Sequence, residues 1–179
     1  IPQLEQEIRA TAEGDARELA LRIELQLGAL QDQLALLGEA VDSGGSPQRL
    51  IERAVGNGRT FRALYVLSAQ GRITAAALSP EYRHLQAEVV DSDLSSAPLF
   101  LDVQQKRTPV WSDKYLSSLT GIVTVGLGVP LGDKKMLLAE LPLSFLLDIG
   151  QHNRSDHQRA VWIIDQRGEL LADTEPDTR

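Results

Sequence analysis

The chain has 179 residues, of which 42% are hydrophobic and 4% aromatic, and its formal net charge is −7. This length allows one sizeable core and part of a second, and the composition predicts a core built mainly from Leu, Val, Ile and Ala. The negative charge argues against nucleic acid and anionic membrane surfaces as partners, because both repel an acidic protein.

The first predicted element is one long helix over residues 4–41. This stretch has no proline and is rich in Ala, Leu, Glu, Gln and Arg, which favour helices. A helix of this length spans roughly 55 Å. We therefore expect it to pair with a partner helix, to run past more than one domain, or both. A single core helix with frayed turns near Gly14 is the alternative.

An a/d heptad seam runs along this predicted helix. Its positions are Ala16, Ala20, Ile23, Leu27, Leu30, Leu34, Leu37 and Val41. We expect the seam to be buried against the chain's own module, a second copy of the chain, or both.

A short helix and a β-hairpin are predicted next. A serine suited to the N-cap, followed by Pro47, predicts a helix over 47–55. The hairpin has strands at 63–67 and 72–77, with Gly71 closing the turn between them.

The polar segment 79–93 is predicted to be a loop. The stretch from Asp93 to Pro98 is expected to cap a helix that runs to about Lys106. The helix must end there because the residues before Pro109 avoid helical geometry.

The stretch 109–131 is the most informative part of the sequence. It opens with a short apolar piece, turns at 117–121 and continues as a strand in which valine and leucine alternate with Thr124, Gly126 and Gly128. One face of this strand is therefore apolar and the other is nearly bare backbone. Glycine inside a strand often marks close approach by a ligand or another backbone. Two interpretations stay open. One is a hollow for a ligand, and the other is a structural role, in which a helix packs tightly against the glycines or a bulge bends the strand.

The C-terminal part repeats the first hairpin. After a strand at 136–141, a short helix from Pro142 to residue 149 and a polar linker, strands are predicted at 160–164 and 169–172. Gly168 takes the place that Gly71 has in the first hairpin. An internal repeat suggests two related units, the second incomplete. Chance similarity between two hairpins is the alternative.

The sequence carries no recognisable catalytic constellation. It has no phosphate-cradling glycine loop, no nucleophile elbow, no HExxH motif and no cysteine. His152, Asp156 and His157 lie close together, but their polar surroundings favour a solvated linker. We therefore predict no catalytic residues, no metal site and no cofactor in this chain.

Several short motifs follow one another in a characteristic order. They are LSAQGR at 67–72, LSSAPLF at 94–100, PVWSDKY at 109–115, LTG at 119–121 and the strand at 125–131. With the long helix before them, they resemble double Cache domains, the PAS-like extracytoplasmic sensors of bacterial histidine kinases, diguanylate cyclases and chemoreceptors.

The resemblance implies an α+β fold, with a long N-terminal helix and a PAS-like module that has a central antiparallel sheet. The expected parts are a signalling helix at 1–45, a membrane-distal module at 46–150 and the start of a similar membrane-proximal module at 151–179. Hairpin-length links between the strands independently favour antiparallel order. The sheet is expected from the segments 61–78, 109–116, 121–131 and 135–141.

The resemblance also implies a periplasmic location, as part of an inner-membrane protein. No apolar run here approaches the roughly 20 residues of a membrane helix, and the chain does not begin with Met. We therefore expect it to be a piece of a longer protein, with flanking membrane helices outside the piece.

The expected function is that of a periplasmic ligand-sensing domain that transmits its signal through the long helix, as a homodimer. The full-length protein is expected to be a signalling enzyme such as a histidine kinase or diguanylate cyclase, while this piece is not an enzyme. A dimerisation module without ligand is the alternative, and a cytoplasmic PAS-type cofactor sensor is a third option.

The predicted ligand pocket lies between the stretch 109–131 and the helix at 94–106. The predicted ligand-binding residues are Tyr65, Trp111, Ser112, Tyr115, Ser117, Thr124 and Gly126. The two aromatic residues of 109–116 supply apolar walls with polar tips, the hydroxyl residues supply neutral hydrogen bonds, and the glycine leaves room to reach backbone. Ordinary core packing of the aromatic residues is the competing interpretation.

Amino-acid-binding members of the family use an Arg and a Trp near the start of the pocket helix, and an Asp two residues after a later Tyr. Here the segment 96–100 has neither Arg nor Trp, and Ser117 stands two residues after Tyr115. The pocket is therefore expected to prefer neutral or singly charged small molecules over zwitterionic amino acids.

Overall fold

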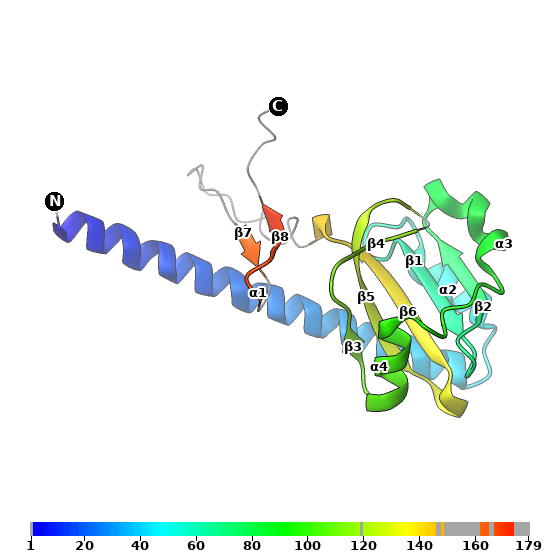
Figure 1. The fold of residues 1–179 in the computed structure, drawn as a ribbon. Coiled ribbons are helices and arrows are strands. Elements are labelled where there is room, and N and C mark those ends of the chain that lie inside the picture. The colour runs from blue at the N-terminus through cyan, green and yellow to red at the C-terminus, as the bar shows by residue number, and fades with distance from the viewer. Residues whose placement is uncertain (1, 119, 146–147, 149–161, 165–166, 174–179) are drawn as a thin grey trace. The chain divides into compact units, whose positions relative to one another are not determined.

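The computed structural model describes residues 2–118, 120–145, 148, 162–164 and 167–173. The chain divides into two compact units, one of residues 31–145 and the other of residues 1–30 together with 146–179. Figure 1 shows the elements in chain order. None of the helices in the described residues is both long and apolar enough to span a membrane.

The long N-terminal helix is confirmed as α1, Pro2–Asp42. It ends where Gly44 takes a positive φ of 93°, which glycine adopts without steric cost. The second half of the heptad seam is buried, with Leu34 fully enclosed. The first half is more open, since Ala16 and Ala20 are exposed. Part of the seam prediction is thus confirmed within a single chain.

Residues 31–145 build one antiparallel sheet in the order β2-β1-β6-β5-β3, with β4 also paired to β5. Its strands are β1 Ala63–Leu67, β2 Ile73–Leu78, β3 Val110–Trp111, β4 Tyr115–Leu116, β5 Val123–Pro130 and β6 Met136–Pro142. The predicted antiparallel sheet and the α+β class are confirmed. One predicted boundary is wrong, because Pro142 ends β6 instead of starting a helix.

Helices and 3₁₀ turns connect and cover these strands. They are α2 Pro47–Val55, η1 Pro80–Leu85, α3 Gln86–Val89, α4 Pro98–Lys106 and η2 Gly132–Lys134. The segment 79–93, expected to be a loop, holds η1 and α3, and Pro80 supplies a preset φ at the start of η1. α4 begins at Pro98, the last residue of the predicted capping stretch, and before it the Asp93 carboxylate accepts the Ser95 N–H in a turn of its own.

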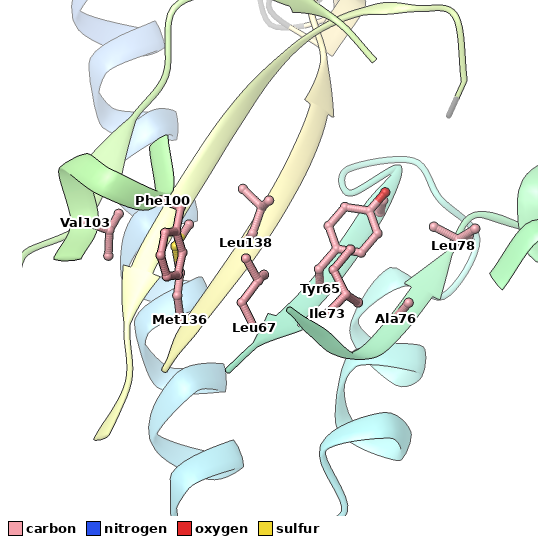
Figure 2. Packing of buried hydrophobic residues seen from close by; sticks show 10 residues of the cluster. Tyr65, Leu67, Ile73, Ala76, Leu78, Phe100, Val103, Met136 and Leu138 are labelled. Carbon is pink, nitrogen blue, oxygen red and sulfur yellow. The ribbon is translucent and has the colours of Figure 1, made fainter. Parts of the chain in front are cut away.

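The register divides the sheet into two faces. Tyr65 pairs with Leu138, and both point to the side covered by α4, η1 and α3. We call this side the α4 face. Figure 2 shows its core, which includes Leu67, Phe100 and Met136.

The opposite side, the α1 face, is covered by residues 31–42 of α1 and by α2, which lie behind the sheet in Figure 1. Strand residues such as Leu64 and Leu137 are fully buried there, as is Ile51 of α2. α1 comes very close to the sheet at Gly38, where an added Cβ would lie 2.9 Å from Leu131 Cδ2.

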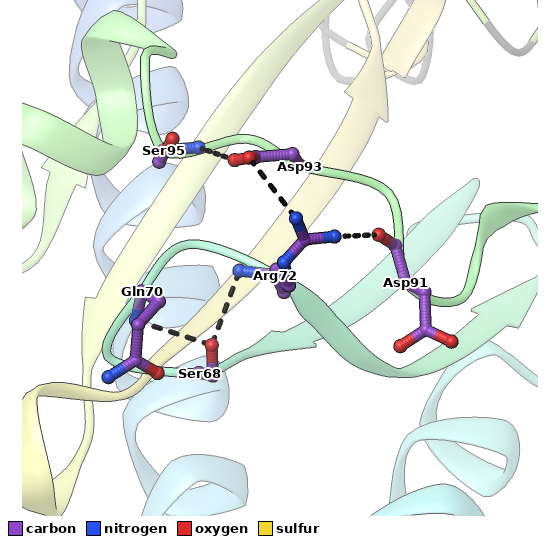
Figure 3. A network of polar contacts seen from close by, with 6 residues as sticks. All are labelled: Ser68, Gln70, Arg72, Asp91, Asp93 and Ser95. Carbon is purple, nitrogen blue, oxygen red and sulfur yellow. Dashed lines mark hydrogen bonds and ion pairs between the residues drawn. The ribbon is translucent and has the colours of Figure 1, made fainter.

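A polar network ties the β1–β2 turn to the start of α4 (Figure 3). Arg72 Nη1 donates to the Asp91 carbonyl at 3.0 Å, and Arg72 Nη2 pairs with Asp93 at 3.8 Å. Gly71, at φ 79°, approaches Ser95 so closely that a Cβ there would lie 2.5 Å from the Ser95 Cα. The turn therefore requires glycine for both its conformation and its packing.

The outer edge of β2 is bonded to parts of the chain outside the sheet. Ile73 exchanges two backbone hydrogen bonds with the 91–92 segment. The Gln48 side chain donates to the Ala76 carbonyl at 2.8 Å and accepts from its N–H at 3.3 Å. The Leu78 N–H donates to the Gln86 side chain at 3.3 Å.

The second hairpin is confirmed as β7 Trp162–Ile164 and β8 Leu170–Asp173, paired antiparallel. Its register shifts between Ile163 and Ile164, the positions that match Val66 and Leu67, where the first hairpin also shifts. The turn glycines, Gly71 and Gly168, have φ of 79° and 80°. The repeat therefore extends to turn geometry and register.

Part of the C-terminal prediction lies outside the described residues. The polar linker with His152, Asp156 and His157 belongs to 149–161, as does the predicted domain boundary after residue 150. These stay predictions.

Candidate functional site

One carboxyl group is buried in the otherwise apolar interior of the α4 face. It belongs to Glu140 of β6, whose exposed fraction is 7%. β6 lies between β1 and β5, where Glu140 pairs with Ala63 on one side and Gly126 on the other. Since neither neighbour has a large side chain, side chains from other segments can approach the carboxyl.

Three hydroxyl groups converge on this carboxyl. Tyr115 Oη donates to Oε1 of Glu140 at 2.9 Å. Ser117 Oγ and Tyr65 Oη donate to Oε2 at 3.2 and 3.5 Å. We call these four residues the Glu140 cluster.

The cluster is assembled from segments far apart in the sequence. Tyr65 comes from β1, Tyr115 from β4 and Ser117 from the turn that follows β4. That turn is fixed by backbone bonds, from the Ser117 N–H to the Ile122 carbonyl at 3.0 Å and from the Gly121 N–H to the Ser117 carbonyl at 2.9 Å. Ser117 is therefore held in place independently of its bond to Glu140.

Burial dominates the electrostatics of the cluster. It raises the pKa of Glu140, and the hydrogen bonds from the three hydroxyls oppose that rise only in part. Burial and the neighbouring carboxylate also raise the pKa of Tyr65 and Tyr115 well above the ordinary tyrosine value. Among the described residues, no Lys, Arg or His forms an ion pair with Glu140.

Three of the predicted site residues meet in this cluster, namely Tyr65, Tyr115 and Ser117. Glu140 itself was not among the predicted residues, because as a single carboxylate it forms no pair at a diagnostic spacing. The signal that could have identified it is a lone charge inside the apolar strand 136–141.

Ser112 lies beside the cluster. Its Oγ accepts the Gly126 N–H at 2.7 Å and donates to the Asp113 carbonyl at 2.6 Å. The Thr124 hydroxyl donates to the Leu141 carbonyl. Both hydroxyls are therefore engaged with backbone.

Trp111 does not join these residues. It pairs with Leu127, whose position in the register places both on the α1 face. Trp111 and Tyr115, which were expected to cover one hollow together, therefore lie on opposite sides of the sheet. β3 ends at Trp111 and β4 begins at Tyr115, and the irregular residues 112–114 reverse the alternation.

The glycine face of β5 is filled by α4. A Cβ at Gly128 would lie 2.5 Å from Met136 Cε and 2.7 Å from Val103 Cγ2. A Cβ at Gly126 would lie 2.7 Å from Leu99 Cδ2. Tight helix packing, one of the two open interpretations, is therefore confirmed at both glycines. The flexible end of Leu99 occupies the space next to Glu140.

The groups of the Glu140 cluster can form hydrogen bonds with a further polar group. When Glu140 is ionised, the hydroxyl hydrogens point toward it, and their oxygens keep lone pairs free to accept further hydrogen bonds. In the part of the chain that the structure describes, no three His, Cys, Asp or Glu side chains gather to hold a metal ion.

Comparison with known proteins supports the fold. No family model matches the chain, and no curated protein sequence matches it. Among solved structures, an extracellular ligand-binding receptor from Desulfohalobium retbaense matches with a TM-score of 0.69 and 17% identity over 87% of this chain. The chain spans only 30% of that receptor.

Two chemoreceptor domains also match. The Campylobacter jejuni Tlp3 ligand-binding domain, in complex with 4-methylisoleucine, has a TM-score of 0.72 and 10% identity over 92% of this chain and 70% of its own. The Pseudomonas aeruginosa PctB domain, in complex with L-Arg, has a TM-score of 0.71 and 16% identity over 97% of this chain and 73% of its own. The chain therefore has the fold of these sensor domains, as its resemblance to Cache domains predicted.

Proposed function

We propose that this chain is an extracytoplasmic ligand-sensing domain whose ligand presents a cationic group to Glu140. The observation that carries this proposal is a buried carboxyl with three hydroxyl donors and no cationic partner among the described residues. Burying a carboxylate without a cation is costly. A ligand cation would remove most of that cost.

The cluster suits an ammonium group in particular. An ammonium donates hydrogen bonds and accepts none, and the carboxylate oxygens and hydroxyl lone pairs of the cluster are acceptors. The rings of Tyr65 and Tyr115 can add a cation–π attraction. The Tlp3 and PctB domains, which share this fold, are in complex with amino acids, and amino acids carry an ammonium group.

The rest of the ligand should be apolar and uncharged. α4 contributes Leu99, Phe100 and Val103 to the α4 face. Its one basic residue, Lys106, is exposed and pairs with Asp102 at 3.3 Å. Since α4 has no arginine to hold a ligand carboxylate, a simple amine suits the site better than a zwitterion.

Signal transmission through α1 is part of the proposal. We infer a homodimer that uses the exposed N-terminal half of the heptad seam, together with membrane helices outside residues 1–179. The helix at 1–45, the module at 46–150 and a second module from 151 would form the periplasmic part of an inner-membrane histidine kinase or diguanylate cyclase.

A dimerisation module without ligand is the second candidate. The observation that favours it is the filled site, because Leu99 occupies the space at Gly126 and the hydroxyls already satisfy Glu140.

Thermal unfolding in the presence of small molecules separates the two candidates. Ligand at 100 times its dissociation constant should stabilise the domain by about 2.7 kcal/mol. We expect primary ammonium ions such as n-butylammonium to stabilise the domain. The matched alcohol n-butanol and the amino acid norvaline should stabilise it less.

Variants identify the site. Glu140→Gln and Tyr115→Ala should abolish the stabilisation, while Trp111→Phe, on the α1 face, should preserve it. A stabilisation that survives Glu140→Gln would place the ligand elsewhere, and the absence of any stabilising ammonium ion would favour the dimerisation module.

A further inference from the structure

The Glu140 cluster can be hydrogen-bonded whether or not Glu140 carries a proton. The ionised carboxylate accepts from the hydroxyls of Tyr65, Tyr115 and Ser117. A protonated carboxyl would donate to one of the same oxygens, because a hydroxyl both donates and accepts. A proton can therefore enter or leave the cluster without leaving a buried polar atom unsatisfied.

The strands around Glu140 supply no charge that would hold it ionised. β1 and β4 contribute the phenols of Tyr65 and Tyr115, and burial keeps both neutral by raising the pKa of each. β5 contributes Gly126, which has no side chain.

The helices on the same face also leave Glu140 uncompensated. α4 turns Leu99 and Phe100 toward the sheet, and η1 adds the phenol of Tyr82. Asp113 and Lys114, between β3 and β4, have interactions of their own. The basic residues at the ends of β1, β2 and α4 have acidic partners of their own, with Arg62 paired to Glu81, Arg72 to Asp93 and Lys106 to Asp102.

We propose that Glu140 holds a proton while the site is empty and releases it to solvent when a cation binds. Ligand binding by the domain would then depend on pH. This inference rests on the proposed function. In the coupled step, the O–H bond of the Glu140 carboxyl breaks and the proton leaves to water. The carboxylate that remains is neutralised by the incoming cation.

Two consequences follow for binding. Below the pKa of Glu140 in the empty site, affinity for a cation should fall about tenfold for each unit of pH. Above that pKa, affinity should not depend on pH. An alkylammonium ligand does not contribute to this dependence, because its own pKa lies near that of lysine, about 10.4.

The first test uses the protein without ligand. ¹³C NMR of glutamate side-chain carboxyls follows each titration, and comparison with Glu140→Gln identifies the Glu140 resonance. We expect Glu140 to titrate at higher pH than the exposed glutamates. A midpoint equal to theirs would overturn the proposal whether or not any amine binds.

The second test repeats the titration with saturating n-butylammonium, or with the ammonium ion that gives the largest thermal shift. The Glu140 midpoint should move to lower pH. Calorimetry in two buffers of different ionisation enthalpy should show release of about one proton per bound amine below the ligand-free midpoint.

The outcomes separate the two proposals. An amine that binds in a Glu140-dependent manner without moving the midpoint would overturn proton coupling and leave the proposed function standing. If no ammonium ion binds, the proposed function fails and proton coupling fails with it. Glu140→Asp, which retains a carboxyl, should keep a pH-dependent affinity, whereas Glu140→Gln should lose it.

Discussion

The two faces of the sheet are closed in different ways. On the α1 face, α1 and α2 contribute apolar side chains such as Leu34 and Ile51, which are fully buried. On the α4 face, the core is interrupted by Glu140 and its hydroxyl partners. Burying a well-packed apolar side chain at position 140 would cost less free energy than burying this carboxyl. The difference indicates that the α1 face serves stability and that the α4 face gives up some stability at Glu140, which the proposed ligand site would explain.

The largest expected effect comes from breaking the α1 face. Leu34→Ala should lower the free energy of unfolding by about 2–5 kcal/mol, and Leu34→Asp should prevent folding because it buries an unpaired charge. Denaturant titration measures the first effect. Leu36→Asp is the matched control, since Leu36 is 66% exposed on the same helix. Equal loss from both aspartate variants would contradict the assignment of the buried side.

The next effect is the pH dependence of stability that Glu140 should give to the α4 face. Burial raises the pKa of Glu140 above that of an unfolded glutamate, so folding takes up a proton between the two values. The stability of the wild type should therefore fall as pH rises through this window, by about 1.4 kcal/mol per unit of pKa difference.

Glu140→Gln should lack this decline. Denaturant titrations of both proteins between pH 4 and pH 8 measure it. Below the unfolded value, about 4.3, Glu140 should contribute no pH dependence. Parallel stability curves for the two proteins across the whole range would refute the raised pKa.

A smaller effect is expected from Tyr115→Phe, which removes the shortest hydrogen bond to Glu140. Leaving a buried acceptor with one partner fewer should cost about 1–3 kcal/mol when Glu140 is ionised. The cost should shrink at low pH, where the protonated carboxyl needs that donor less. The cost of Trp111→Phe, on the other face, should not vary with pH, and the same titrations compare the two.

The smallest effects concern two glycines of α1. Gly28 has open space around it, so Gly28→Ala should stabilise the helix by up to about 1 kcal/mol. Gly38 lies against the sheet, and the contact with Leu131 should cancel this gain. Thermal melts of the two alanine variants give the difference. A larger gain at Gly38 would mean that α1 is not closely packed there.

Local patterns in the sequence were sufficient to predict much of the fold. The heptad seam predicted α1, and the turn glycines predicted both hairpins, because these signals depend on residues close together in the chain. The segment 79–93 was harder to predict, since η1 and α3 are short and are stabilised by apolar contacts with the sheet.

The Glu140 cluster was predicted only in part, for a geometric reason. Tyr65, Tyr115 and Ser117 were predicted from residue type, but their shared partner lies on a different strand and becomes visible only once the register is known. Trp111 was placed on the wrong face because the irregular residues 112–114 change the face to which the side chains after them point. A break in strand alternation leaves little trace in a single sequence.

The bonded outer edge of β2 has a consequence for association between chains. An open edge strand acts as a template that recruits strands from other molecules, and it is a common origin of aggregation. At β2 the outward N–H and carbonyl groups of Ile73 and Ala76 and the N–H of Leu78 are already engaged. These bonds oppose growth of the sheet past β2 from one molecule into the next.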